Sequence, residues 1–111
     1  MKQDLEIKIQ VKQILNVVEK IAPGRSVELR IPPYAAIQCV EGGNHRRGTP
    51  PNVVEMSAQT LLNLSKEPQK WEQLCSEGSI SASGTNSNLA ELFTRVSKLI
   101  SNFDEELSNG K

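Results

Sequence analysis

Three kinds of side chain near the middle of the chain could together carry nucleophilic chemistry. Cys39 supplies a thiol and His45 a general base. Glu41 or Glu55 could orient the imidazole, which would complete a nucleophile, base and orienter set. No spacing brings these groups together, however, and Cys39 lies in an apolar segment where a buried cysteine behaves as a small hydrophobic residue with a raised pKa. We therefore expect no catalytic residue.

The segment 41–52, EGGNHRRGTPPN, combines glycines with a short run of cations. These cations are His45, Arg46 and Arg47. Guanidinium groups bind carboxylate or phosphate through two parallel donors, and neighbouring glycines let backbone N–H groups approach the same anion. Two interpretations stay open, namely an anion or lipid-headgroup contact, and a solvated loop whose arginines pair with Glu41 or Glu55.

Composition narrows the classes of function. The chain has 111 residues, with 13 Lys and Arg against 13 Asp and Glu, which predicts one domain over 1–111 and no nucleic-acid partner. We expect its core within about 4–107 and a flexible tail at 108–111. One His and two separated Cys match no metal-ligand spacing, so neither a metal site nor a cofactor is expected. The cysteine content and the lack of a long apolar run predict a cytoplasmic protein.

The clearest predicted element is a long C-terminal helix. Apolar residues recur there at three- and four-residue spacing, which places them on one stripe. They are Leu89, Leu92, Phe93, Val96, Leu99, Ile100, Phe103 and Leu107. Asn88 and Glu91 are a suitable capping pair for the first turn. Another apolar surface must cover this stripe.

The remaining pattern predicts an α+β fold. The opening segment fits either a strand or a helix, and the helical pattern covers more positions, from about Asp4 to Ile21. Alternation predicts strands at 27–31, 35–40, 53–56 and 79–83. Two short helices fit between the last two strands, one capped by Ser57 and one starting near Pro68.

Two stretches resemble the bacterial sterol carrier family, small relatives of the type-two sterol carrier domain. They are RIPPYAAIQCVEG from Arg30 and HRRGTPPNVVE from His45. The later segments VVEM, LL, ISASG and the last helix are similar to the same family in their order. The resemblance covers roughly residues 4–100.

The resemblance implies a curved, mainly antiparallel sheet covered on one face by helices, with an apolar tunnel for lipids or fatty acyl chains. It also implies no cofactor and, usually, no catalysis. We count four strands where the wider fold has five. From the residues themselves we expect two kinds of ligand contact. Tyr34 follows two prolines and offers an apolar ring with a polar hydroxyl, and the apolar stripe of the last helix offers Leu92, Phe93, Val96 and Ile100.

The favoured interpretation is therefore a non-enzymatic carrier of a hydrophobic small molecule. One alternative is an enzyme or accessory subunit that binds an anionic substrate through His45, Arg46 and Arg47. Another is an interaction domain that uses the C-terminal helix, and the sequence also leaves room for a homodimer and for transient membrane contact.

Overall fold

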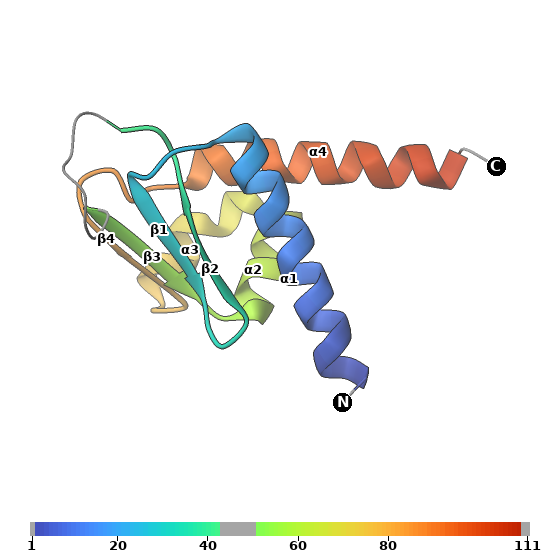
Figure 1. Ribbon diagram of the computed structural model, residues 1–111, viewed down its shortest axis with the longest axis horizontal. Helices are drawn as coiled ribbons and strands as arrows, with labels where there is room; N and C mark the ends of the chain where they lie inside the picture. The colour runs from blue at the N-terminus through green and yellow to red at the C-terminus, as the bar shows by residue number, and fades with distance from the viewer. Residues whose placement is uncertain (1, 43–50, 110–111) are drawn as a thin grey trace.

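A computed structural model describes residues 2–42 and 51–109 of the chain. In chain order its elements are α1 (Lys2–Ile21), β1 (Val27–Ile31), β2 (Ala35–Cys39), β3 (Asn52–Met56), α2 (Ala58–Lys66), the 3-10 turn η1 (Pro68–Lys70), α3 (Trp71–Ser76), β4 (Ile80–Ser83) and α4 (Ala90–Asn109). One sheet forms one layer and the helices form the other (Figure 1). This confirms the predicted α+β class and the long C-terminal helix.

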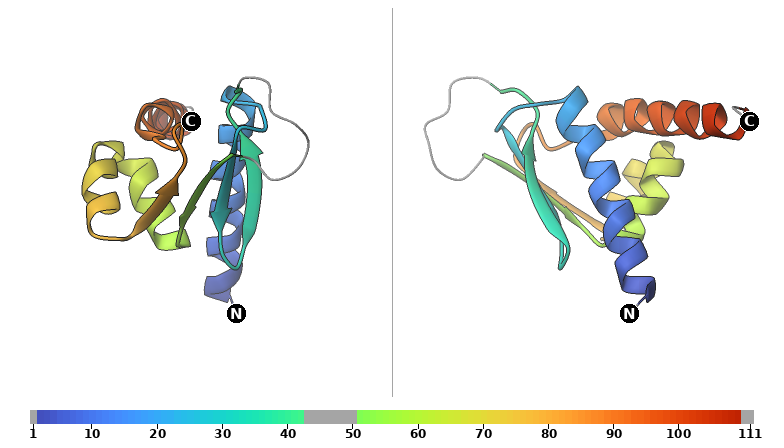
Figure 2. Two further views of the ribbon diagram at one scale, coloured as in Figure 1. Left: turned by 90° about the vertical axis from the view of Figure 1, so that its left-hand side faces the viewer. Right: turned by 45° about the vertical axis from the view of Figure 1, so that its right-hand side comes forward.

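The four strands form one mixed sheet in the order β2-β1-β3-β4. The outer pairings are antiparallel, and Leu29 of β1 stands opposite Ile37 of β2. The central pairing of β1 with β3 is parallel, with Leu29 level with Val54. The sheet is thus mainly antiparallel, as expected, but its centre is not. The right panel of Figure 2 shows the helices gathered on one side of it.

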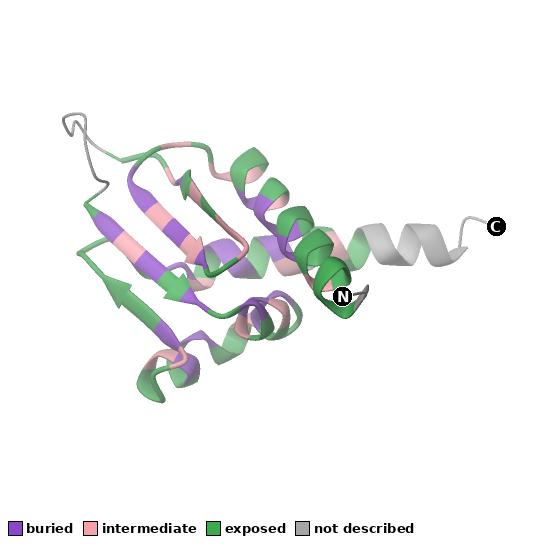
Figure 3. Ribbon diagram, turned by 60° about the horizontal axis from the view of Figure 1, so that its bottom comes forward, coloured by how far each residue is buried: buried purple, intermediate pink, exposed green. Residues whose placement is uncertain are grey.

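Alternating burial in the strands follows from this one-sided cover. Val27, Leu29 and Ile31 point toward the helices and are fully buried. Glu28 and Arg30 point to the opposite face, which no described helix covers (Figure 3). Residues of a strand alternate between the two faces of a sheet, so only one set reaches the core.

α1 resolves the strand-or-helix ambiguity of the opening segment in favour of the helix. Its buried residues recur at helical spacing against β2 and α2. They are Val11, Ile14, Leu15 and Val18. The first turns lie outside that contact, because Leu5 and Ile9 are 57% and 49% exposed.

The short helices begin where the sequence predicts. The Ser57 hydroxyl accepts a hydrogen bond from the Thr60 N–H at 3.1 Å, which caps α2. Pro68 opens η1, and Trp71, the first residue of α3, stacks on Phe93 of α4 with ring centroids 6.4 Å apart. The Asn88 side chain accepts a hydrogen bond from the Ala90 N–H at 2.9 Å at the start of α4.

Candidate functional site

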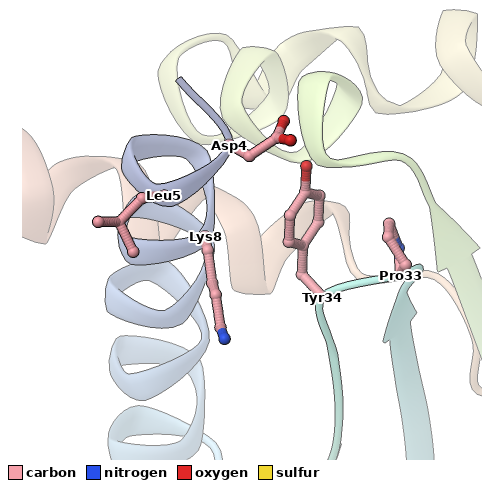
Figure 4. Close-up of a pocket in the computed structure, with 5 residues that line it drawn as sticks. All are labelled: Asp4, Leu5, Lys8, Pro33 and Tyr34. Atoms are coloured by element: carbon pink, nitrogen blue, oxygen red, sulfur yellow. The ribbon is translucent and has the colours of Figure 1, made fainter. Parts of the chain in front are cut away.

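A surface hollow lies between the first turns of α1 and the turn that joins β1 to β2. Its volume is about 390 Å³, and its lining consists of Asp4, Leu5, Lys8, Pro33 and Tyr34. Figure 4 shows α1 on one side and the hairpin turn on the other, with the ring of Tyr34 between them. This volume is within the range of small-molecule sites, and it is open to solvent.

Tyr34 is held by the hairpin turn itself. Its backbone N–H donates to the Ile31 carbonyl at 2.8 Å, and the preceding Pro32–Pro33 peptide bond is cis. The side chain is half-buried and packs against the core. An aromatic ring ending in a hydroxyl offers one apolar and one polar surface, so Tyr34 suits a ligand that has both.

The hollow is amphipathic. Leu5, Pro33 and the Tyr34 ring supply apolar surface, whereas Asp4 and Lys8 supply charges of both signs. An ammonium group beside apolar surface can pair with the carboxylate of an amphiphile whose chain lies against the apolar part. The chemistry of this lining fits a small amphiphilic molecule.

The α4 residues expected to contact ligand lie deeper in the fold. Phe93 and Val96 are fully buried, Leu92 is buried and Ile100 is half-buried against the core. The α4 helix contacts η1, α2 and α1, whereas the hollow that Tyr34 lines is formed by α1 and the hairpin. The structure therefore places the five residues in two locations.

The second candidate site lies around Ser26, which forms hydrogen bonds with the residues at both ends of the 41–52 segment. At one end the Ser26 N–H donates to the Val40 carbonyl at 3.0 Å. At the other end the Asn52 side-chain amide donates to the Ser26 carbonyl at 2.9 Å and to its hydroxyl at 3.2 Å. We call Ser26 and Asn52, which are both buried, the clasp. The expected anion contacts His45, Arg46 and Arg47 lie outside the described residues.

Close packing surrounds the clasp. The Asn86 N–H donates to Asn52 Oδ1 at 2.9 Å, which ties the segment before α4 to the same point. A Cβ on Gly42 would lie 2.7 Å from the Ser26 hydroxyl, and one on Gly84 would overlap Asn52 Oδ1. Val40 has φ +66°, a conformation that is costly for a β-branched residue. Backbone strain of this kind is often found in segments that bind ligands or change conformation.

Glu55, one of the expected partners of the arginines, already faces a cation. Arg30 donates to Glu28 at 3.1 Å, and its guanidinium lies 3.8 Å from the Glu55 carboxylate. The hydrogen bond and charge of Glu28, with a smaller contribution from Glu55, raise the pKa of Arg30. These three charged side chains occupy the uncovered face of the sheet.

Cys39 is fully buried, as expected from its position in an apolar strand. Burial raises the pKa of its thiol to about 11, with a further contribution from the charge of Glu19. A thiol with that pKa is protonated at neutral pH and is a poor nucleophile. Cys75 is half-buried, and burial also raises its pKa.

Among residues 2–42 and 51–109 no three His, Cys, Asp or Glu side chains gather as a metal site would require. No helix within those ranges has the length and apolar character that crossing a bilayer demands.

Leu5, Lys8 and the clasp residues are not predicted as site residues by the sequence pattern. Leu5 and Lys8 belong to the helical pattern of α1, and only the folded hairpin brings them beside Tyr34. Asn52 has the better signal, because a polar residue directly before the apolar pair Val53-Val54 begins a buried strand. Such a residue needs a hydrogen-bond partner, but the pattern does not identify Ser26 as that partner.

Comparison with known protein families identifies a relationship that covers most of the chain. The family model described as "Bacterial SCP ortholog" matches residues 3–94, which include α1, the whole sheet and the first turns of α4. The comparison with curated proteins gave no significant match.

Proposed function

Because the chain belongs to the bacterial SCP ortholog family, we propose that it is a non-enzymatic carrier of a lipid or fatty acyl chain. The observation that carries this function is the amphipathic hollow, where Tyr34 and Leu5 offer apolar surface beside the ammonium of Lys8. A fatty acyl ligand needs both kinds of contact. The buried, protonated Cys39 agrees with a role that involves no nucleophilic catalysis.

In this function Tyr34 contacts the ligand at the hollow. The inner contacts are Leu92, Phe93, Val96 and Ile100 of α4. Neighbouring residues bury most of these four side chains, so a chain that reaches them must displace part of α1 or α4. The exposed first turns of α1 make the α1 side the easier one to open.

We further propose that His45, Arg46 and Arg47 contact the acidic group of a ligand or lipid headgroup. The clasp supports this proposal, because it holds both ends of the segment that carries these cations at one buried point. A segment anchored at both ends loses less conformational entropy when it binds.

A fluorescent fatty acid titrated into the purified protein tests the carrier function. Leu5→Ser should weaken its binding about tenfold, since one lost apolar contact of this size is worth about 1.5 kcal/mol or more. Ile9→Ser is the matched control, because Ile9 is similarly exposed on the next turn of α1 and does not line the hollow. Equal affinity in both variants would place the ligand elsewhere, and no binding to the wild type would contradict the carrier function.

A further inference from the structure

The hollow between α1 and the hairpin contains one acidic and one basic side chain that do not pair with each other. Asp4 and Lys8 lie about one turn apart on α1, and both are exposed. An acidic residue four positions before a lysine is well placed to pair with it on a helix. In the part of the chain that the structure describes, however, the ion pairs include neither residue. Each charge is therefore available to a ligand.

The two side chains point to different ends of the hollow. In Figure 4 the Asp4 carboxylate lies toward the hydroxyl of Tyr34, whereas the Lys8 side chain runs the opposite way along α1. The hollow thus has an acidic end, formed by Asp4 and the outer part of the Tyr34 ring, and a basic end at the Lys8 ammonium.

Each end suits a different part of a ligand head group. A cationic ammonium at the acidic end would meet the opposite charge of Asp4 and the ring of Tyr34, whose face attracts cations. An acidic group at the basic end would pair with the ammonium of Lys8. A ligand with one charge satisfies one end only, and a purely anionic head group is also repelled by Asp4.

We infer, on the basis of the proposed carrier function, that the hollow selects amphiphiles with a zwitterionic head group. The ammonium of the ligand lies at Asp4 and Tyr34, and its acidic group lies at Lys8. Leu5 and Pro33 then contact the adjoining part of the apolar chain. A simple fatty acid binds the same hollow through Lys8 alone, and therefore more weakly than a zwitterion of equal chain length.

Three amphiphiles of matched chain length test this selectivity by isothermal titration calorimetry at low ionic strength, below their micelle concentrations. Dodecylphosphocholine carries both charges, dodecanoate only the acidic group, and dodecyltrimethylammonium only the cation. The wild type should bind dodecylphosphocholine about threefold or more tightly than either of the others, because a second exposed charge pair contributes an amount of this order.

Substitutions that remove one charge assign the two ends. Asp4→Asn should abolish the preference for dodecylphosphocholine over dodecanoate, whereas Lys8→Gln should weaken dodecanoate but not dodecyltrimethylammonium. Glu6→Gln and Lys12→Gln are the matched controls, because both residues are exposed on α1 and neither lines the hollow. Asp4 also lies in the first turn of α1, where a carboxylate stabilises a helix, but the loss of that effect would weaken all three amphiphiles alike.

Equal affinity of the wild type for dodecylphosphocholine and dodecanoate would overturn the inference, and so would an Asp4→Asn variant that keeps the wild-type preference. Fatty acid binding that depends on Leu5, without any preference for the zwitterion, would overturn the inference and leave the carrier function intact. Failure of the wild type to bind the three amphiphiles and the fluorescent fatty acid would contradict both.

Discussion

The Asn52 side-chain amide reaches 26 residues back along the chain to donate to the carbonyl and the hydroxyl of Ser26, at 2.9 and 3.2 Å. This contact joins the start of β1 to the start of β3, which are neighbouring parallel strands. It also leaves Asn52 Oδ1 free to accept the Asn86 N–H before α4. One buried amide therefore connects three separate segments.

Removal of this amide should lower the free energy of unfolding. Asn52→Ala leaves the Asn86 N–H and the Ser26 hydroxyl without their partner, at an expected cost of about 1–3 kcal/mol. Urea denaturation measures this value. Asn63→Ala is the control, because Asn63 makes only an exposed hydrogen bond with Gln59, and it should cost less than about 0.5 kcal/mol. Equal losses of unfolding free energy in the two variants would mean that the buried clasp stabilises the protein no more than an exposed hydrogen bond does.

Alanine substitutions at two glycines with positive φ can distinguish the cost of backbone strain from the cost of crowding. Gly78 has φ +85° with open space around it, whereas Gly84 has φ +109° and packs directly on Asn52. Alanine at either position meets the backbone penalty of about 1–2 kcal/mol. Gly84→Ala must also displace Asn52, so it should destabilise the protein by about 1–3 kcal/mol more than Gly78→Ala. Thermal unfolding of both variants decides this, and a larger effect at Gly78 would be inconsistent with the packing.

Cys39 should react slowly with iodoacetamide in the native protein. Its thiol is fully buried and its pKa is about 11, so little thiolate exists at neutral pH. A Cys75→Ser background leaves Cys39 as the only thiol in the assay. Rapid labelling that His45→Ala abolishes would contradict this and would favour the enzyme alternative.

The raised pKa of Cys39 also predicts that the protein loses stability at alkaline pH. Burial raises the Cys39 pKa from 9.0 in the unfolded chain to about 11, so between these values the unfolded state loses a proton that the native state keeps. The contribution is complete below pH 9 and disappears as pH rises through about 11. The free energy of unfolding should fall by up to about 2–3 kcal/mol more in the wild type than in Cys39→Ala across that window. Parallel curves for the two proteins would contradict it.

Phe93→Ala tests the contact between α4 and α3. Phe93 is fully buried and stacks on Trp71, so its truncation should cost about 3–5 kcal/mol. Tryptophan fluorescence during urea unfolding reports on both residues, since Trp71 is the single tryptophan. A cost well below about 3 kcal/mol would indicate that the side chain borders open space rather than a packed core.

The anion contact has its own test. Arg46→Gln with Arg47→Gln should leave the unfolding free energy nearly unchanged, because exposed ion pairs contribute little. Binding of acidic lipids should weaken, and the difference from wild type should shrink at high salt. Unfolding of the double variant would instead favour the interpretation in which these arginines pair with Glu41 or Glu55.

The elements of the fold follow from local pattern, but their assembly depends on distant contacts. Alternation predicts β1, and the Ser57 cap predicts the start of α2, because each depends on neighbouring residues. The parallel pairing of β1 with β3 depends on contacts between residues 25 positions apart, such as Leu29 and Val54. Local periodicity contains no information about such pairings.

The same distinction applies to the two candidate sites. Tyr34 stands out in the sequence because it is the only tyrosine and follows two prolines. Leu5 and Lys8 become its neighbours only after α1 folds against the hairpin. Val40 gives no sequence signal for its left-handed backbone, because a β-branched residue is among the least expected there.

Ligand extraction from the purified protein, followed by mass spectrometry, tests the carrier function most directly. The wild type should release a lipid or fatty acid in an amount close to one per chain, and Leu5→Ser should release less than Ile9→Ser. Protein that releases no apolar molecule, and that takes none up from fatty acid or phospholipid supplied in excess, would contradict the function proposed here.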